Sequence, residues 1–182
     1  MKEQVPVIQR TRVLIVDDSA SMRAVLKKAL QTDPRIDVVG GAANADIARR
    51  MIKELSPDVM LLDVEMPGMD GITFLEKIMR LKPMPVVMCS SLTAKGTDTT
   101  IEAMRLGAVE CIAKPAGGPE ALLREARTLR ETVKAASRST LRAISHDLPR
   151  SAPKAGGCNQ ELVIGIGAST GGVEALFSLL SA

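Results

Sequence analysis

Short apolar runs alternate along the first 116 residues with stretches in which apolar side chains recur every three or four positions. The runs predict β-strands at residues 12–17, 36–40, 59–63, 86–90 and 109–113. In the first of them, RVLIVD, consecutive aliphatic side chains suit a parallel strand that is covered on both faces. The stretches between the runs predict amphipathic helices, because their apolar positions share one face of a helix.

Capping residues indicate where several of these helices begin. Ser19 and Asn44 precede helical stretches, where their side chains can accept hydrogen bonds from free backbone N–H groups. The loop MPGMDG precedes a helix expected from Ile72 to about Leu81. A long last helix is expected from Pro119 to about Ala136, because proline suits the first position of a helix.

Five strand–helix units within about 130 residues indicate an open parallel sheet with helices on both faces. Right-handed crossovers bring the carboxyl ends of all the strands to one edge of such a sheet. Ligands bind at that edge, at the point where the strand order reverses. The predicted fold class is therefore α/β, a doubly wound five-stranded parallel sheet with its chemistry at the carboxyl edge.

Composition and charge exclude several classes of function. The 182 residues include no Trp or Tyr and two Phe, which argues against single-stranded nucleic-acid platforms that stack bases on aromatic rings. The formal net charge of +3 is too small a surplus to decide for or against DNA binding. Cys89, Cys111 and Cys158 lie far apart without C-x-x-C spacing, which argues against a disulfide framework and a zinc site.

The apolar runs also bear on location. None of them approaches the ~18–20 residues of a membrane span, and the N-terminus lacks the apolar segment of a signal peptide. We therefore expect a cytoplasmic protein with no membrane insertion and no nucleic-acid partner.

Polar residues follow four of the five predicted strands and should meet at the carboxyl edge of the sheet: Asp17 and Asp18, Asp63, Ser90, and Lys114. Three neighbouring carboxylates repel one another, so they need a cation or a proton to coexist. Hard oxygen ligands with room for water suit Mg2+. Lys114 and Ser90 could bind a phosphoryl group, so the set suits phosphoryl transfer onto a carboxylate. The alternative is that each Asp merely caps a helix or begins a turn.

Residues 10–135 resemble the receiver domain of bacterial two-component response regulators. The resemblance rests on Asp-Asp after the first strand, on the run from Asp63 to Gly71 (DVEMPGMDG) and on Lys-Pro after the fifth strand. The resemblance implies a flavodoxin-like fold and a histidine kinase that donates a phosphoryl group to Asp63. It also implies a Mg2+ site formed by the following groups: Asp17, Asp18, Asp63 and the backbone carbonyl of Glu65.

The resemblance further implies that Ser90 and Lys114 contact the phosphoryl group and couple it to the exposed face of the sheet. This sequence departs from the family three positions before the lysine, where an aromatic switch residue is usual and Cys111 stands. A small thiol cannot swing between pockets as an aromatic ring does, so the conformational response is expected to differ.

Basic residues gather after the predicted receiver. Residues 117–160 hold 8 basic and 4 acidic side chains, and Arg124, Arg127, Arg130 and Lys134 recur at helical spacing. Such a stripe can bind nucleic acid or acidic surfaces. The alternative, which we favour, is a solvated helix face with Leu123 and its apolar neighbours packed inward. Residues 136–160 are rich in Ser, Pro, Gly and Ala and predict an interdomain linker.

Residues 161–182 predict a strand, a glycine-rich turn and a helix, the start of a second, incomplete α/β domain. A dinucleotide fingerprint would need glycine where Thr170 stands, and a Walker A loop would need Gly-Lys-Ser/Thr. The Gly-x-Ser-x-Gly pattern of a serine nucleophile is met by Gly167, Ser169 and Gly171. An ordinary glycine-rich turn is the alternative reading.

The chain resembles the CheB-type chemotaxis methylesterases, which are the protein-glutamate methylesterases and glutamine deamidases of receptor adaptation. The resemblance rests on the order of a receiver, a linker and a G-A-S-T-G-G turn, and on the S-L-T-A-K-G run at 91–96. The resemblance implies that Ser169 is the nucleophile, that methylated chemoreceptors are the substrate, and that a chemotaxis histidine kinase is the phosphodonor. It also implies that phosphorylation of the receiver relieves its block on the esterase site.

The nucleophile has no partners in these 182 residues. In the family a His and an Asp further along the chain complete the triad, and the chain ends about 13 residues after Ser169. His146 stands in the predicted linker and does not match the family's position. We therefore expect no esterase activity from residues 1–182 themselves. Two alternatives remain, a stand-alone receiver that works by binding and a transcriptional regulator, although residues 137–182 show no helix-turn-helix pattern.

Overall fold

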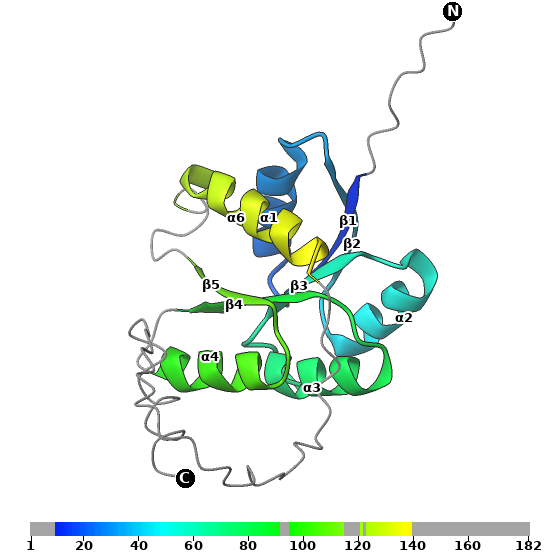
Figure 1. Ribbon diagram of the computed structural model, residues 1–182, viewed down its shortest axis with the longest axis vertical. Helices are drawn as coiled ribbons and strands as arrows, with labels where there is room; N and C mark the ends of the chain where they lie inside the picture. The colour runs from blue at the N-terminus through cyan, green and yellow to red at the C-terminus, as the bar shows by residue number, and fades with distance from the viewer. Residues whose placement is uncertain (1–9, 92–94, 115–120, 122, 140–182) are drawn as a thin grey trace, which may run out of the picture. The chain divides into compact units, whose positions relative to one another are not determined.

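A computed structural model describes residues 10–91, 95–114, 121 and 123–139. The predicted linker, the glycine-rich turn, His146, Cys158 and Ser169 all lie outside these residues. Within them the chain forms a five-stranded parallel sheet in the order β2-β1-β3-β4-β5, with helices on both faces (Figure 1). The doubly wound α/β fold predicted from the sequence is confirmed.

The described strands and helices follow the predicted order. The strands are β1 (Thr11–Val16), β2 (Ile36–Ala42), β3 (Val59–Asp63), β4 (Val86–Ser91) and β5 (Glu110–Lys114). The helices are α1 (Ala20–Gln31), α2 (Ala45–Leu55), α3 (Gly71–Leu81), α4 (Lys95–Arg105) and α6 (Ala126–Ser137). Most observed ends lie within one residue of the predicted ones, and β2 runs two residues further than expected.

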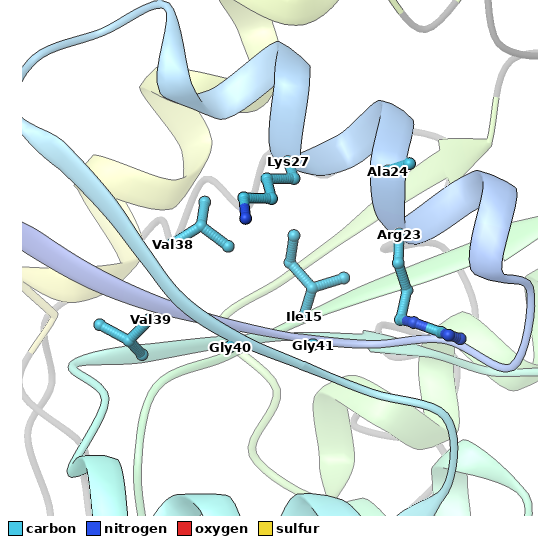
Figure 2. A pocket seen from close by; sticks show the side chains of 8 residues that line it. All are labelled: Ile15, Arg23, Ala24, Lys27, Val38, Val39, Gly40 and Gly41. Atoms are coloured by element: carbon cyan, nitrogen blue, oxygen red, sulfur yellow. The ribbon is translucent and has the colours of Figure 1, made fainter.

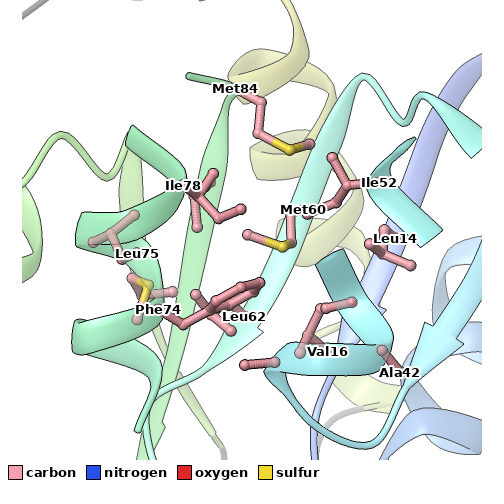
Figure 3. Close-up of a cluster of buried hydrophobic side chains, with 14 of the residues drawn as sticks. Leu14, Val16, Ala42, Ile52, Met60, Leu62, Phe74, Leu75, Ile78 and Met84 are labelled. Carbon is pink, nitrogen blue, oxygen red and sulfur yellow. The ribbon is translucent and has the colours of Figure 1, made fainter. Parts of the chain in front are cut away.

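Hydrophobic side chains form one layer on each face of the sheet. On one face, residues of β1, β3 and β4 pack against α2, α3 and α4, with Phe74, Leu62 and Met60 fully buried (Figure 3). On the other face, the same strands pack against α1 and α6. Each fully buried side chain of this size contributes about 1.5–3 kcal/mol of transfer free energy, so the central strands are the rigid frame of the fold.

Side-chain caps begin three helices where the sequence places polar residues. The hydroxyl of Ser19 accepts the N–H of Met22 at 3.3 Å, and the Asn44 amide oxygen accepts that of Ile47 at 2.9 Å. The carboxylate of Asp70 accepts the backbone N–H of Thr73 at 2.8 Å, and this bond lowers the pKa of Asp70. The caps predicted at Ser19 and Asn44 are therefore confirmed.

The last helix differs from the prediction. The expected start at Pro119 lies outside the described residues, and a turn at Glu125, where ψ is 5°, separates residues 123–124 from α6. Because of this turn Leu123 does not share the buried face of α6 and is 36% exposed. The expectation that Leu123 packs inward is therefore wrong.

The basic stripe is also less solvated than expected, because α6 is attached to the end of α1 by two of its cations. The Lys134 ammonium lies 2.7 Å from the carboxylate of Asp33, and its side chain is 16% exposed. Arg130 donates to the carbonyl of Ala29 at 3.1 Å and to the hydroxyl of Thr32 at 2.7 Å. By contrast, Arg127 pairs on the surface with Glu131. The cations that face α1 thus hold the last helix to the end of α1.

No helix in the described part of the chain is long and apolar enough to cross a membrane.

We expect Lys134→Met to lower the free energy of unfolding by about 1–2 kcal/mol at pH 7, because it removes a shielded charge-assisted hydrogen bond and keeps the aliphatic stem. Hydrogen bonds from Arg35 and Lys134 hold the pKa of Asp33 well below its usual range. Their stabilisation is complete above the unfolded pKa of about 3.9 and declines as the pH falls toward the lower folded value. The penalty of Lys134→Met should therefore shrink below about pH 4, measured by urea unfolding followed by circular dichroism.

The matched control is Arg127→Met, which removes a cation of the same helix whose ion pair with Glu131 is solvent-exposed. Exposed pairs contribute little to stability, so this variant should unfold like the wild type. Equal effects of the two substitutions, or a Lys134→Met penalty that does not depend on pH, would contradict the proposed role of Lys134.

Candidate functional site

Three carboxylates lie together at the carboxyl edge of the sheet, as the sequence predicted. Asp17 and Asp18 directly follow β1, and Asp63 is the last residue of the neighbouring strand β3. One oxygen of each carboxylate lies within 4.8 Å of the other two. Asp17 and Asp63 are almost completely buried, at 1% and 3% exposure, whereas Asp18 is exposed.

Lys114 joins the two buried carboxylates. Its Nζ lies 2.7 Å from Oδ2 of Asp63 and 3.0 Å from Oδ2 of Asp17. The lysine reaches them from the end of β5, which pairs with β4, which in turn pairs with β3. The positive charge required by neighbouring carboxylates is thus supplied in part by the protein itself.

Backbone groups fix the orientation of both buried carboxylates. Oδ1 of Asp17 accepts the N–H of Ser19 at 2.9 Å, and the Asp17 N–H donates to the carbonyl of Ala42 at 3.1 Å. Oδ1 of Asp63 accepts the N–H of Glu65 at 3.2 Å. Backbone N–H groups just after β1 and β3 therefore help to hold each carboxylate in place, in addition to the side chain of Lys114.

Burial and neighbouring charge shift the pKa values of Asp63 and Lys114 in opposite directions. Burial raises the pKa of Asp63, and the hydrogen bond and charge of Lys114 offset only part of this effect, so the net pKa is raised. Burial alone would lower the pKa of Lys114, but its bonds to Asp63 and Asp17 outweigh burial, and that pKa is raised. The lysine therefore remains a cation at neutral pH beside an acid whose ionised form is destabilised.

The donor atoms fit a hard divalent cation. All three side chains offer carboxylate oxygens, the ligand type that Mg2+ prefers, and one of them faces solvent. Beside them an open cleft of about 760 Å³ runs between the β3–α3 loop and α4, and its lining includes Asp18, Glu65 and Thr99. The cleft leaves room beside Asp18 for the water ligands that Mg2+ usually keeps.

Two further residues singled out in the sequence, Ser90 and Cys111, lie on β4 and β5, and the roles predicted for them stay predictions. Ser90 lies near the end of β4, half-buried and paired in register with Ala113 of β5, one residue before Lys114. Cys111 lies on β5 opposite Met88 and packs against the buried layer of α3 and α4. Burial raises the pKa of the Cys111 thiol to about 11 and that of Cys89 to about 12, so both stay protonated thiols of low reactivity.

Two contributors to the site were missed in the sequence. A β-carbon at Gly71 would overlap the carbonyl oxygen of Asp63, so this position needs glycine for the loop to close against the end of β3. The available signal was the second glycine of the run MPGMDG, which is Gly71. Arg23 of α1 donates from Nη1 to the carbonyls of Asp17 and Asp18. Nothing in the local sequence pattern distinguishes Arg23 from the other cations of the chain.

Comparisons with known proteins agree with this fold and site. Residues 13–127 match the family described as the response regulator receiver domain. The response regulator domain of Thermotoga maritima CheB, a crystal structure, aligns with a TM-score of 0.66 and 44% identity over 72% of this chain and 98% of that one. The chain therefore belongs to the response regulator receiver family, and its receiver is of the CheB type found in chemotaxis response regulators.

Curated relatives extend the similarity beyond the receiver. A protein-glutamate methylesterase/protein-glutamine glutaminase 1 of Caulobacter vibrioides is 51% identical over 176 residues, which are 94% of this chain and 50% of the relative. A protein-glutamate methylesterase/protein-glutamine glutaminase of Agrobacterium fabrum is 48% identical over 93% of this chain and 49% of the relative. The chain thus spans about half the length of the curated relatives it matches.

We expect Asp63→Asn to raise the free energy of unfolding at pH 7 by about 1 kcal/mol when EDTA removes divalent metal. Because burial raises the pKa of Asp63, ionisation of this carboxyl opposes folding at neutral pH, and the amide removes that charge at nearly the same volume. The opposition disappears as the pH falls below the unfolded pKa of about 3.9, so the difference from wild type should vanish there.

Urea unfolding at pH 7 and at acidic pH measures this effect. Asp46→Asn serves as the control, because it removes an exposed carboxylate at the start of α2 without relieving any repulsion among buried carboxylates. A loss of stability in Asp63→Asn at pH 7 would contradict the argument.

Proposed function

We propose that this chain is a phosphoacceptor switch in which Asp63 is the phosphorylated residue. The observation that carries the proposal is a buried, oriented carboxylate, Asp63, that lies beside a cation, Lys114, and two further carboxylates, of which Asp18 lines an open cleft. Acceptance of a phosphoryl group requires a positioned oxygen nucleophile and positive charge around the transferred oxygens.

In the proposed reaction an oxygen of Asp63 attacks the phosphorus of the donor. A new O–P bond forms while the bond from phosphorus to the donor's leaving atom breaks, and that atom keeps the electron pair. Lys114 already lies 2.7 Å from Oδ2 of Asp63, so its ammonium is placed to bind the phosphoryl oxygens as they arrive. Ser90, on the neighbouring strand, is proposed as a hydroxyl donor to the same oxygens.

The proposed metal ligands are carboxylate oxygens of Asp17, Asp18 and Asp63 with the backbone carbonyl of Glu65. When bound there, Mg2+ would supply positive charge to the carboxylates and to the transferred phosphoryl group. The role of the protein in this arrangement is to hold the oxygen ligands in place before the donor arrives, which the backbone bonds to Asp17 and Asp63 support.

The wider function is proposed from the relatives named above. We propose that residues 10–135 receive the phosphoryl group from a chemotaxis histidine kinase, that residues 136–160 form a linker, and that residues 161–182 begin a methylesterase domain. In the whole protein Ser169 would be the nucleophile that acts on methylated chemoreceptors, gated by phosphorylation of Asp63. A stand-alone receiver that acts by binding alone is the second candidate.

Incubation with acetyl phosphate and Mg2+ should add the mass of one phosphoryl group to the chain, detected by intact-mass spectrometry. Asp63→Asn should abolish the addition, because the amide oxygen is a poor nucleophile. EDTA should suppress it, because the metal charge is lost. Lys114→Met should reduce it by about 10-fold or more, the scale expected for removing one electrostatic contact to developing charge.

Asp58→Asn is the control, because Asp58 lies just before β3 at the opposite end of the strand from Asp63. Phosphorylation that persists in Asp63→Asn, or that proceeds equally in EDTA, would contradict the proposed acceptor and metal site respectively.

The whole-protein proposal is tested in the protein as it exists in its native cells. Ser169→Ala should abolish methanol release from methylated chemoreceptors. Asp63→Asn should leave the basal release and remove its increase on stimulation of the kinase. Methanol release that survives Ser169→Ala would contradict the nucleophile, and phosphorylation without any Ser169-dependent release would favour the stand-alone receiver.

A further inference from the structure

Arg23 makes an unusual contact behind the carboxylate cluster. From α1 its side chain reaches toward the strands (Figure 2). Its Nη1 donates to two successive backbone carbonyls, that of Asp17 at 2.7 Å and that of Asp18 at 3.0 Å. One nitrogen therefore fixes the direction of both peptide groups in the turn from β1 to α1.

This contact acts on residues whose side chains belong to the proposed metal site. Because the side chain and the carbonyl of a residue leave the same backbone, holding both carbonyls on the α1 side limits where the two carboxylates can lie. The constraint matters most for Asp18, whose side chain is exposed and therefore has few packing contacts to orient it. Asp17 is held in addition by Ser19 and Ala42.

Gly41 of the edge strand β2 leaves the space that Arg23 occupies. A β-carbon at Gly41 would lie 3.5 Å from Cδ and 3.8 Å from Nε of Arg23, which is ordinary van der Waals contact. Alanine therefore fits there, whereas the additional γ-carbons of valine would compete with the arginine side chain for space. Both residues line a cleft of about 260 Å³ between α1 and β2 that also contains Lys27 (Figure 2).

We propose that Arg23 is a positioning residue for the divalent-cation site: it acts through the carbonyls of Asp17 and Asp18 to hold their carboxylates in the geometry that binds Mg2+. The inference rests on the proposed metal site and adds a residue that is not itself a ligand. Hydrogen-bond partners that orient metal ligands commonly raise metal affinity by about 10–100-fold.

Whether removal of Arg23 weakens or tightens Mg2+ binding distinguishes a positioning role from an effect of its charge alone. A guanidinium near the site repels Mg2+, so if Arg23 acted through its charge alone, its removal would tighten metal binding. If Arg23 acts by holding the carbonyls, its removal weakens metal binding, even though a positive charge that repels Mg2+ has been removed. A purely structural role would lower stability and leave the dissociation constant of the folded protein unchanged.

The test is calorimetric titration of Mg2+ into the 182-residue chain at neutral pH. We expect Arg23→Met to raise the dissociation constant about 10-fold or more, and Arg23→Lys, which keeps a donor and the charge, to fall between the variant and wild type. Lys27→Met is the matched control, because it removes an exposed cation of the same helix and cleft and should not weaken binding.

Gly41 supplies a second test in which Arg23 and every ligand stay intact. Gly41→Val should weaken Mg2+ binding in the same direction as Arg23→Met, and Gly41→Ala should bind like wild type. The carbonyl carbon NMR shifts of Asp17 and Asp18 report whether the guanidinium bonds are lost, and urea unfolding in EDTA reports whether the variants are folded.

The experiments distinguish failure of the Arg23 role from failure of the proposed metal site. Unchanged or tighter Mg2+ binding in a folded Arg23→Met, or in a Gly41→Val whose carbonyl shifts show the bonds lost, would overturn the role of Arg23 and leave the proposed function standing. Failure of the wild-type chain to bind Mg2+ would overturn the proposed metal site and the inference with it.

Discussion

The rest of the site depends on one electrostatic constraint, the gathering of carboxylates at the end of adjacent parallel strands. Asp17 and Asp63 are buried within reach of each other, and their mutual repulsion is held in check by Lys114. This balance is incomplete, because the pKa of Asp63 remains raised. Because the ionised form of Asp63 is disfavoured in the folded protein, positive charge added at the cluster would offset that cost, and the proposed Mg2+ would supply such charge.

The sheet order brings this constraint about. β1 and β3 are neighbours although α1, β2 and α2 separate them in sequence, so the Asp17–Asp18 pair and Asp63 meet at the point where the strand order reverses. β5 lies two strands away from β3, a distance that the long side chain of lysine spans. Buried layers on both faces fix the strands, so the charged groups cannot separate to relieve their repulsion.

Sequence reasoning found the groups whose position follows from strand periodicity. Asp63 and Lys114 end apolar runs, and Ser19 and Asn44 begin helical patterns, so each position is encoded within a few neighbouring residues. The contact of Lys134 with Asp33 joins positions 101 residues apart, and no local pattern encodes it. The turn at Glu125 was also missed, because the spacing of apolar and basic residues on both sides of it predicts one continuous helix.

The difference between local and long-range information also explains why the sequence revealed the three carboxylates but not the role of Arg23. The side chains proposed as metal ligands are all carboxylates, so their residue type reveals them, whereas a supporting group needs only a hydrogen-bond donor in the right place. Arg23 is one of many surface-type cations in the chain, and its importance comes from its two carbonyl bonds and the space left by Gly41. Because Arg23 holds backbone and not side-chain oxygens, it can stiffen the turn without competing with a metal ion for the carboxylates. Lys114 does compete, since it binds the same Asp17 and Asp63 oxygens directly. The site therefore uses its two cations differently, one to neutralise the carboxylates and one to aim them.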